Sequence, residues 1–376
     1  MSQHSFFTHF HHLHDPRVER TKRHSLMDIL FIAVCAMLGG ANDFVGMEKF
    51  GKSKIGWLQK FIKLPNGIPS HDTFGRVFQA LEPQEFAASF QSWVRGFEDI
   101  VQGAFINIDG KTARAAHDKA NDLQALHVVS AWASDHGLVL GQVAVDDKSN
   151  EITAIPKLLQ ILELHGALVT IDAMGCQSDI AATLHERGAD YILAVKGNQE
   201  HLEEDVVAAF AAADEQREAG QSKGLPTVFE NSSAGHGRQE QRRCEALPVP
   251  KTLRNPAKWP GLRSICRVTR TYTEKGVEKS EVRYFISTLP PQAQRLGMAI
   301  RGHWGVENGL HWVLDMVFDE DRSRARLNHA QENLALVRRW VLSVLRQDKT
   351  IPGGIQKKRL QAGWNERNME NLLNLF

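Results

Sequence analysis

Cysteine and net charge are both scarce in this chain of 376 residues. The 4 cysteines lie far apart and form no C-x-x-C pair, so neither a disulfide framework nor a thiolate zinc site is indicated. The 45 Lys and Arg against 44 Asp and Glu leave a formal net charge of +1, which alone points to no nucleic acid, membrane or acidic partner. A reducing cytoplasm fits this composition best.

Long hydrophobic runs are also missing. The longest apolar stretch, Ile29 to Ala41, has 13 residues, fewer than the ~20 that span a bilayer. It also follows too long and polar a segment to be a secretory signal. With 42% apolar and 24% charged residues, the chain is neither disordered nor collagen-like, and its length suggests two or three folded units. We expect a soluble intracellular protein.

Residues 1–24 hold six of the 17 histidines and four Lys or Arg side chains. A histidine tract that binds metal is one reading. We favour a solvated basic arm that orders on a partner, because no cysteine or carboxylate pattern accompanies these histidines.

Residues 25–100 are predicted to form a small all-helical N-terminal domain. Ser25 can cap a helix that runs through Leu38 and ends at Gly39-Gly40. Prolines separate the further helices that the apolar spacing predicts. These lie at about 44–62, 70–81 and 83–98.

From Gly103 onward the pattern changes to short apolar runs of strand length. The expected strands are 104–108, 126–133, 138–145, 167–171 and 191–195, with helices at 151–164 and 178–187. A three-stranded meander followed by α-β units predicts an α/β domain with a mixed five-stranded sheet and helices on its faces.

The remaining chain divides into three parts. Residues 200–288 are interpreted as an insertion in the α/β domain, with a charged helix and strand-like runs at 261–272 and 281–288. A helical stretch from Pro290 to about Val317 and a helix at 325–346 complete a catalytic domain of residues 101–346. Residues 347–376 are expected to be a C-terminal tail.

Three carboxylates are the candidates for chemistry. Asp109 and Asp172 each follow a hydrophobic strand, where α/β sheets place functional groups, although an Asp there is often only a turn residue or a cap. Glu307 stands within a helix among aromatic residues, where we expect a buried carboxylate that must be paired or bound to metal. Three oxygen donors favour Mg²⁺ or Mn²⁺, and such a set can hold two ions about 3.5–4 Å apart for phosphoryl displacement.

Several motifs together resemble the DDE transposases of bacterial insertion sequences, in the branch that includes the H-repeat-associated proteins. The matching runs are Ile108–Thr112, Thr170–Gln177, Val195–Gln199 and His303–Trp312, followed by Phe318–Asp321. The resemblance implies a ribonuclease-H-like domain in which Asp109, Asp172 and Glu307 bind the metal. It also implies a helical N-terminal domain, double-stranded DNA as partner (terminal inverted repeats and target), and a homodimer on DNA.

The chain departs from the broader group around the glutamate. That group has Tyr-x-x-Arg-x-x-x-Glu-x-x-x-x-x-x-Lys, where this sequence has Ile300, His303, Glu307 and Leu314. His303 is a candidate to replace the Arg as a phosphate contact, and Arg301 or Lys196 to supply the missing charge. Each has a plain alternative, since Lys196 could be only an exposed charge at a strand end.

Other readings of this region remain open. His303, Glu307 and His311 could present a zinc site on one helix face, but positions i and i+8 are ~12 Å apart along the axis. Trp304 could stack on a base near a distorted DNA end, although core packing is the default for it and for Trp312 and Trp340. Cys176 could be a nucleophile, but no His–Asn arrangement supports this, so packing is favoured.

The overall charge conceals local differences. Residues 101–200 carry 7 basic and 13 acidic side chains, while Arg238–Arg270 has nine basic against two acidic ones and Arg322–Arg346 six against one. Cationic runs beside an acidic metal site suit an enzyme that holds DNA phosphates. The candidate DNA-binding residues are Lys111, Lys196, Arg242, Arg243, Arg254, Arg301, His303 and Trp304.

The sequence therefore predicts a transposase that cleaves DNA at the ends of a mobile element and transfers the cut strand. A DNA-binding relic without activity and a ribonuclease-H-like nuclease are the alternatives. The expected location is the bacterial cytoplasm, on the nucleoid when bound to DNA.

Overall fold

The computed structural model describes residues 5–97, 101–113, 125–146, 149–235, 238–274 and 277–376. The chain divides into two compact units. The first contains Met1–Asp99, Gly110–Ser149 and Glu307–Phe376, and the second contains Ile100–Asp109 and Asn150–Val306. This division differs from the predicted one, because the N-terminal helices share a unit with the C-terminal part of the chain.

The first unit is mainly helical. Its helices are α1 (Ser5–Phe10), α2 (Leu26–Leu38), α3 (Phe44–Ser53), α4 (Ile55–Leu58), α5 (His71–Ala80), α6 (Pro83–Val94), α12 (Trp312–Phe318), α13 (Ala330–Gln347), α14 (Ile355–Trp364) and α15 (Glu366–Leu373). The predicted cap of α2 is confirmed, since Ser25 Oγ accepts a hydrogen bond of 3.0 Å from the Asp28 amide. Gly40, with φ of 104°, follows the end of this helix.

Trp340 of α13 lies at the centre of the aromatic core of this unit. Its side chain is fully buried and stacks on Phe10 of α1 at a centroid distance of 5.0 Å. It also contacts Trp93 of α6 and Phe376 at the C-terminus. The solvated arm is therefore wrong for residues 5–13, and the C-terminal residues form helices of the unit instead of a tail, because both ends supply apolar side chains that this core buries.

Two strands, β2 (His127–Ala133) and β3 (Leu138–Ala144), form an antiparallel hairpin in the first unit, as predicted. Gly137, with φ of 64°, supplies the left-handed residue of the turn. The hairpin contacts α6 and α13. It thus belongs to the same core as the aromatic cluster.

The second unit contains the larger sheet. Strand β1 (Phe105–Thr112) enters it with residues 105–109 and pairs in parallel with β4 (Leu168–Ile171), which pairs in parallel with β5 (Asp190–Val195). The order continues β5-β9-β8-β7-β6 through antiparallel strands β6 (Thr227–Gly235), β7 (Arg238–Pro248), β8 (Ser264–Glu274) and β9 (Val277–Ser287). An α/β unit with a mixed sheet is confirmed, but the predicted five strands are too few.

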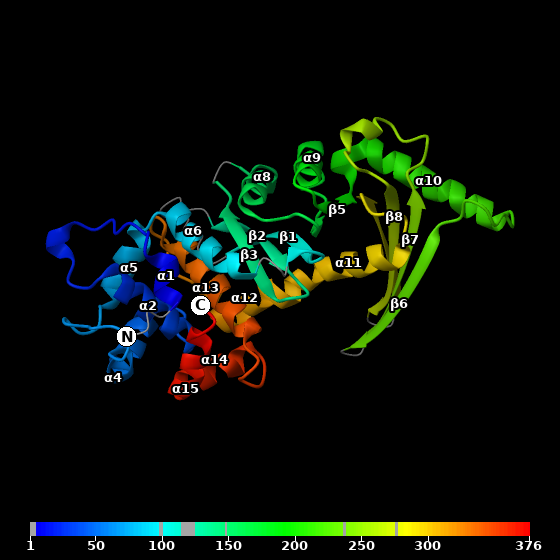
Figure 1. Ribbon diagram of the computed structural model, residues 1–376. Helices are drawn as coiled ribbons and strands as arrows, with labels where there is room; N and C mark the ends of the chain where they lie inside the picture. Colours follow the sequence, from blue (N-terminus) through cyan, green and yellow to red (C-terminus); the bar gives the residue numbers. More distant parts are fainter. Residues whose placement is uncertain (1–4, 98–100, 114–124, 147–148, 236–237, 275–276) are drawn as a thin grey trace. The chain divides into compact units, whose positions relative to one another are not determined.

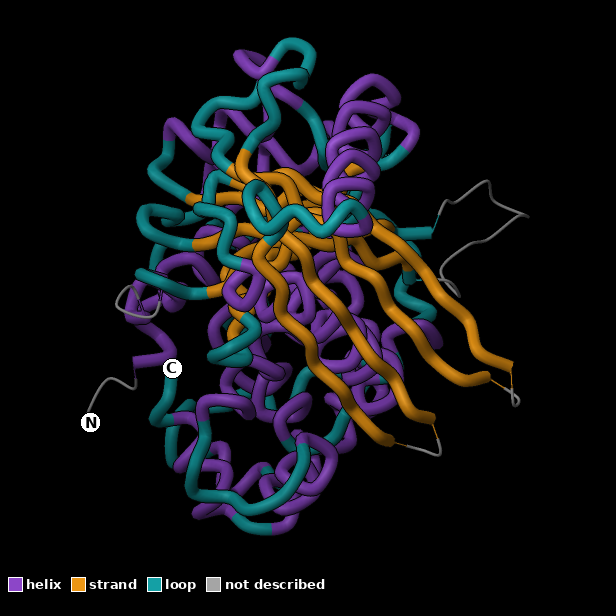
Figure 2. The backbone as a smooth tube through the Cα atoms, turned by 90° about the vertical axis from the view of Figure 1, so that its right-hand side faces the viewer, coloured by secondary structure: helices purple, strands orange, loops and turns teal. Residues whose placement is uncertain are grey.

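The four added strands come from the predicted insertion. They extend the sheet beyond β5, and Figure 2 shows long orange strands that lie side by side. The runs predicted at 261–272 and 281–288 correspond to β8 and β9, whereas β6 and β7 were not predicted, because β7 reads Arg-Gln-Glu-Gln-Arg-Arg-Cys-Glu and its charged side chains hide the apolar alternation.

The described residues of the second unit include four longer helices. They are α8 (Glu151–Ile161), α9 (Ser178–Glu186), α10 (Glu200–Glu218) and α11 (Ala293–Val306). Helix α11 packs on β6, β7, β8 and β4 (Figure 1). Cys244 of β7 faces α11, whereas Glu245 contacts Arg217 of α10, so the two helices cover opposite faces of the added strands.

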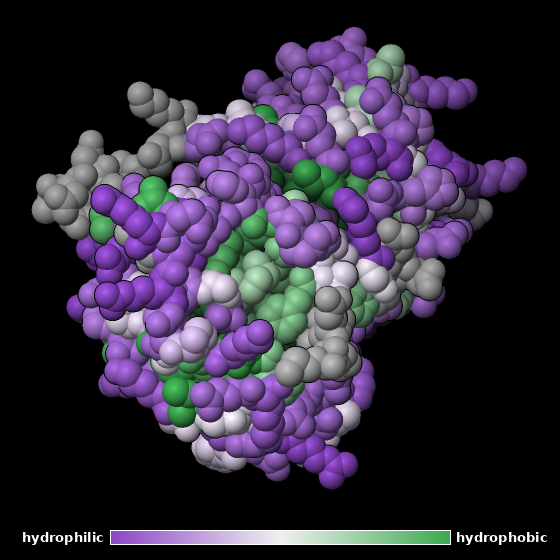
Figure 3. Space-filling view, turned by 60° about the vertical axis from the view of Figure 1, so that its left-hand side comes forward, coloured by the Kyte–Doolittle hydropathy of each residue, from purple (hydrophilic) through white to green (hydrophobic). Residues whose placement is uncertain are grey.

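No helix in the described part of the chain is long and apolar enough to cross a membrane. Hydrophilic residues predominate on the face shown in Figure 3. The four cysteines are free and buried.

Candidate functional site

Asp109 and Asp172 lie at corresponding positions of two neighbouring parallel strands. The register of β1 and β4 pairs Asn107 with Thr170 and Ile108 with Ile171, so the next residue of each strand is one of the two aspartates. Both residues are half-buried. Because side chains alternate across a sheet, both aspartates lie on the face that also carries Asn107 and Thr170. The prediction that the two strands are neighbours is confirmed, and Asp172 directly follows β4, but β1 continues to Thr112, so Asp109 lies within its strand and not at the carboxyl end.

The Asp172 carboxylate is oriented by its own loop. Its Oδ1 accepts backbone hydrogen bonds from Met174 at 3.1 Å and Gly175 at 3.3 Å. Burial, followed by the negative charge of Glu151, raises the pKa of Asp172, although these two amides and Lys196 oppose the shift. The turn-residue reading thus describes real contacts of Asp172, and these contacts also hold the carboxylate at the end of the strand.

A buried polar chain connects the strands to α11. Asn107 Nδ2 donates to Thr170 Oγ1 at 2.6 Å, and Thr170 Oγ1 lies 2.9 Å from His303 Nδ1. Burial, followed by the cation of Arg283, lowers the pKa of His303 to about 4. An imidazole with this pKa is uncharged near pH 7, and its Nδ1 already lies beside Thr170 Oγ1, so the phosphate contact of His303 stays a prediction.

Glu307 begins a π-helical turn, Glu307–His311, that follows directly after α11. Its side chain is exposed, so the expectation of a buried glutamate is wrong. Single π turns of this kind are frequent at functional sites.

The described residues contain no group of three or more His, Cys, Asp or Glu side chains that could hold a metal ion. Asp109 and Asp172 belong to the second unit, and Glu307 is the first residue of the last segment of the first unit. Hard oxygen donors suit Mg²⁺ or Mn²⁺, so the two aligned aspartates are chemically compatible with either ion.

Lys111 does not face solvent as a DNA contact would. In the first unit its Nζ lies 2.6 Å from Asp315 Oδ1, 3.1 Å from Asp321 Oδ1 and 3.5 Å from Glu320 Oε2, and the residue is 8% exposed. Burial lowers the pKa of Lys111, but these carboxylates outweigh it and raise the pKa overall. The DNA-binding assignment of Lys111 is therefore wrong, because its charge is used inside the fold.

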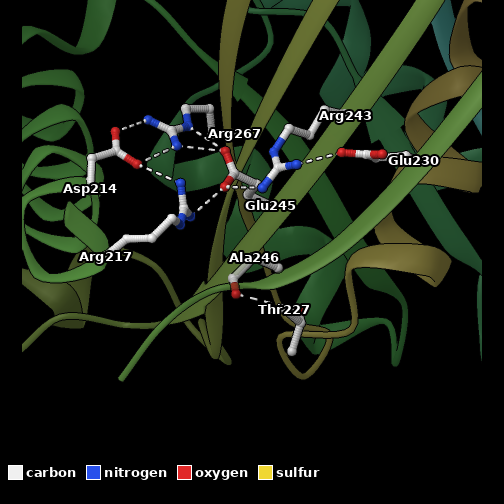
Figure 4. A network of polar contacts seen from close by, with 8 residues as sticks. All are labelled: Asp214, Arg217, Thr227, Glu230, Arg243, Glu245, Ala246 and Arg267. Carbon is white, nitrogen blue, oxygen red and sulfur yellow. Dashed lines mark hydrogen bonds and ion pairs between the residues drawn. The ribbon is translucent and has the colours of Figure 1, made fainter. Parts of the chain in front are cut away.

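Carboxylates neutralise much of the basic run Arg238–Arg270, and some of them come from outside it. Figure 4 shows Arg267 between Asp214 of α10, at 2.6 Å, and Glu245 of β7, at 2.5 Å. Arg243 pairs with Glu230 on the neighbouring strand and, at 3.4 Å, with Glu245.

Arg254 is paired as well, by two carboxylates of α10. Its Nε lies 2.8 Å from Asp205 Oδ1 and its Nη2 lies 2.7 Å from Glu204 Oε2. Counting charge along the sequence missed such partners because they come from another helix or from the adjacent strand. The nine cations of this run therefore do not form one free basic face.

Three other candidates do come together. Arg242 of β7 and Arg301 and Trp304 of α11 line one cavity of about 440 Å³ in the second unit. The guanidinium carbon of Arg242 lies 5.2 Å from the Trp304 ring centre, and that of Arg283 lies 5.0 Å from it. Arg242 also pairs with Glu240. Only the tertiary fold reveals this cluster, because its members lie on different elements.

The remaining candidates have simpler settings. Lys196 is exposed directly after β5 and acts electrostatically on Asp172. Burial, followed by the charge of Asp172, raises the pKa of Cys176 to about 12, so this thiol is packing, as favoured. Trp340 is in the core, but core packing is wrong for Trp312, which is 56% exposed on α12.

Comparison with known proteins defines the class. Residues 102–343 match the family described as the transposase DDE domain, and residues 7–94 match the DDE_Tnp_1-associated family. The chain belongs to the DDE transposase family, and its similarity to the H-repeat-associated branch is confirmed.

Two relatives match almost the whole chain. "Putative transposase YncI" of Escherichia coli O157:H7 is 39% identical over 364 residues, covering 96% of this chain and 92% of that protein. "H repeat-associated putative transposase YhhI" of Escherichia coli K12 is 36% identical and covers 93% of this chain and 92% of that protein. Among solved structures, a piggyBac transposase synaptic complex with hairpin DNA matches with a TM-score of 0.42 and 11% identity, over 96% of this chain and 73% of that one.

Proposed function

We propose that this chain is a transposase that binds the ends of its mobile element, cleaves them and transfers the cut strand to target DNA. The observation that carries this proposal is the alignment of Asp109 and Asp172 on paired parallel strands in a chain of the DDE transposase family. We assign the second unit a ribonuclease-H-like fold, in keeping with its mixed sheet and flanking helices.

Glu307 is the third carboxylate of the proposed site. It stands in the run His303–Trp312, one of the motifs that resemble the DDE transposases of bacterial insertion sequences. The exposure of Glu307 leaves its oxygens accessible to a ligand.

Asp109, Asp172 and Glu307 would hold Mg²⁺ or Mn²⁺ in this proposal, with two ions in a complete site. Bound divalent ions activate water and neutralise charge on a phosphodiester. The protein fixes the Asp172 rotamer through the Met174 and Gly175 amides. Lys196, Arg242, Arg301 and Trp304 would contact the DNA, and a homodimer would pair the two element ends.

The test is Mg²⁺-dependent nicking of a plasmid that carries the element's flanking sequences. Nicking should fall by more than about 100-fold in each of Asp109→Asn, Asp172→Asn and Glu307→Gln. Loss of a residue that only hydrogen-bonds to a metal ligand costs up to about 100-fold, so a larger loss indicates a ligand itself. Glu186→Gln, at an exposed site on α9, is the matched control and should be active. Robust activity of Asp109→Asn would overturn the assignment.

A second measurement separates the alternatives. A transposase should join a pre-cut end with a free 3′-hydroxyl to target DNA, whereas a nuclease of the same fold should only cut. A relic should bind the ends and do neither. Joined product in the wild type, together with its loss in Glu307→Gln, would support the proposal.

A further inference from the structure

A wide groove in the first unit gathers four arginines that the proposed active site does not use. It has a volume of about 820 Å³ and lies between α5, the start of α3 and the segment that follows α12. Arg76 of α5 lines one side, and Arg322, Arg324 and Arg326 line the other. Both sides belong to the same unit, so the groove is a feature of that unit alone.

The fold sorts the cations of the run Arg322–Arg346 into two groups. Arg338 and Arg339 are each 1% exposed and face Glu320, and Arg346 donates to the Gly309 carbonyl at 3.0 Å. Those three arginines therefore hold the interior together. The other three arginines of the run line the groove instead of forming a helix face.

Three carboxylates line the groove: Asp72 is exposed and lies 3.5 Å from His71 Nε2, and the other two accept hydrogen bonds within the protein. Asp43 Oδ1 caps α3 through the Gly46 amide at 2.7 Å, and Asp319 Oδ2 accepts from Asn42 Nδ2 at 2.9 Å. Arg322 reaches Asp319 only at 3.9 Å, with 88% of its side chain exposed. Such an exposed pair contributes at most about 1 kcal/mol, so a phosphate can readily displace it.

The spacing of the arginines suits a repeating anion. Residues 323–326 form neither helix nor strand, and Ser323 has extended backbone angles. In an extended chain, alternate residues such as Arg322 and Arg324 are up to roughly 7 Å apart. Along the helix axis, each strand of duplex DNA presents one phosphate per 3.4 Å. The two arginines can therefore contact nearby phosphates of one strand.

We propose that this groove binds the phosphate backbone of duplex DNA through Arg322 and Arg324, with Arg76 contacting it from α5. The inference rests on the proposed function and adds to it a second DNA contact, in the first unit and apart from Arg242, Arg301 and Trp304. Because the arginines contact phosphates and not bases, this contact is independent of DNA sequence.

The test is fluorescence anisotropy of the full-length protein with a labelled 30-base-pair duplex of arbitrary sequence, between 50 and 200 mM KCl without divalent ions. The double variant Arg322→Gln/Arg324→Gln should bind more weakly, and the slope of log K against log salt should fall by about 2, one for each lost phosphate contact. Arg367→Gln, at an exposed position of α15 in the same unit, is the control and should retain the wild-type slope.

The outcomes separate this inference from the proposed function. Wild-type binding with an unchanged slope in the double variant overturns the groove alone, whereas a wild type that does not bind the duplex overturns both. The double variant Arg322→Lys/Arg324→Lys should keep the wild-type slope, since it preserves the charge. Circular dichroism at the assay temperature identifies any variant that is unfolded. If Arg322→Gln/Arg324→Gln loses the wild-type binding to a polyglutamate peptide but still binds the duplex like the wild type, the groove binds a protein partner and the proposal is overturned.

Discussion

Glu320 is the carboxylate whose removal should damage the first unit most. It is 3% exposed, and its Oε1 accepts from Arg339 Nη1 at 2.8 Å. Arg338 Nη1 lies 4.0 Å from the same oxygen, and Lys111 Nζ lies 3.5 Å from Oε2. One negative charge thus compensates cations from two separate parts of the chain. We expect Glu320→Gln to leave the two guanidinium groups buried without that charge.

Breaking a buried ion pair by removing one partner costs about 3–5 kcal/mol. For a unit of this size, each kcal/mol lowers the melting temperature by about 2–4 °C, so a fall of roughly 10 °C is expected. Urea unfolding followed by circular dichroism measures the free energy, and calorimetry gives the melting temperature.

The loss of stability caused by Glu320→Gln should also depend on pH. Burial raises the pKa of Glu320, but Arg339, Arg338 and Lys111 outweigh it, so the pKa is lower in the folded state than in the unfolded state. The stabilisation is then complete above the unfolded pKa, about 4.3, and is lost as the pH falls through the folded pKa. The difference between wild type and Glu320→Gln should therefore narrow below about pH 4.

Glu366→Gln is the matched control in the same unit. Its partner Lys60 lies 3.1 Å away, but the two side chains are 46% and 57% exposed, so the loss should be under about 1 kcal/mol. If Glu320→Gln proves no more destabilising than Glu366→Gln, the reasoning about the buried cluster is refuted.

Three further predictions concern the second unit. The pKa of Asp172 is higher in the folded protein than in the unfolded chain, so the ionised carboxylate destabilises the fold once the pH exceeds the unfolded pKa. Asp172→Asn should therefore raise the melting temperature of the metal-free protein at pH 7, and a lower melting temperature would contradict this. His303→Gln should leave the salt slope of DNA binding unchanged, since a neutral imidazole releases no counterion, and a slope lower by about 1 would show a phosphate contact. Gly297→Val brings a Cβ to 3.0 Å from Cys244 Cβ and should cost about 1–3 kcal/mol in urea unfolding, whereas Gly305→Ala on the same helix meets nothing within 4 Å and should not destabilise.

Local patterns predicted the parallel part of the fold well. The apolar runs before Asp109 and Asp172 are strands β1 and β4, and Ser25 caps α2 as its sequence indicates. Strands β6 and β7 were missed because an exposed ribbon can carry charges on both faces when helices cover only part of each. The division into units was missed because it joins segments far apart in the chain.

The candidate site was predictable to a different degree for each residue. The two aspartates follow from the apolar runs that precede them, because each run forms the paired part of a strand, although β1 continues past Asp109 to Thr112. The surroundings of Lys111 and His303 did not follow, because a lysine or histidine has the same local pattern whether it meets solvent, a carboxylate or a hydroxyl. Burial decides their charge and role, and burial depends on partners from other elements.

The sequence by itself determined the family, the two aligned aspartates and the α/β character of the second unit, because these depend on short motifs and on periodicities of a few residues. Only the tertiary structure decided which of the many cations are available. It turned Arg338, Arg339 and Lys111 inward to meet Glu320, paired Arg254 with helix α10, and left other arginines lining the groove. The physical reason is that an ionic partner is selected by distance in space, and a net charge counted along the chain contains no such distances.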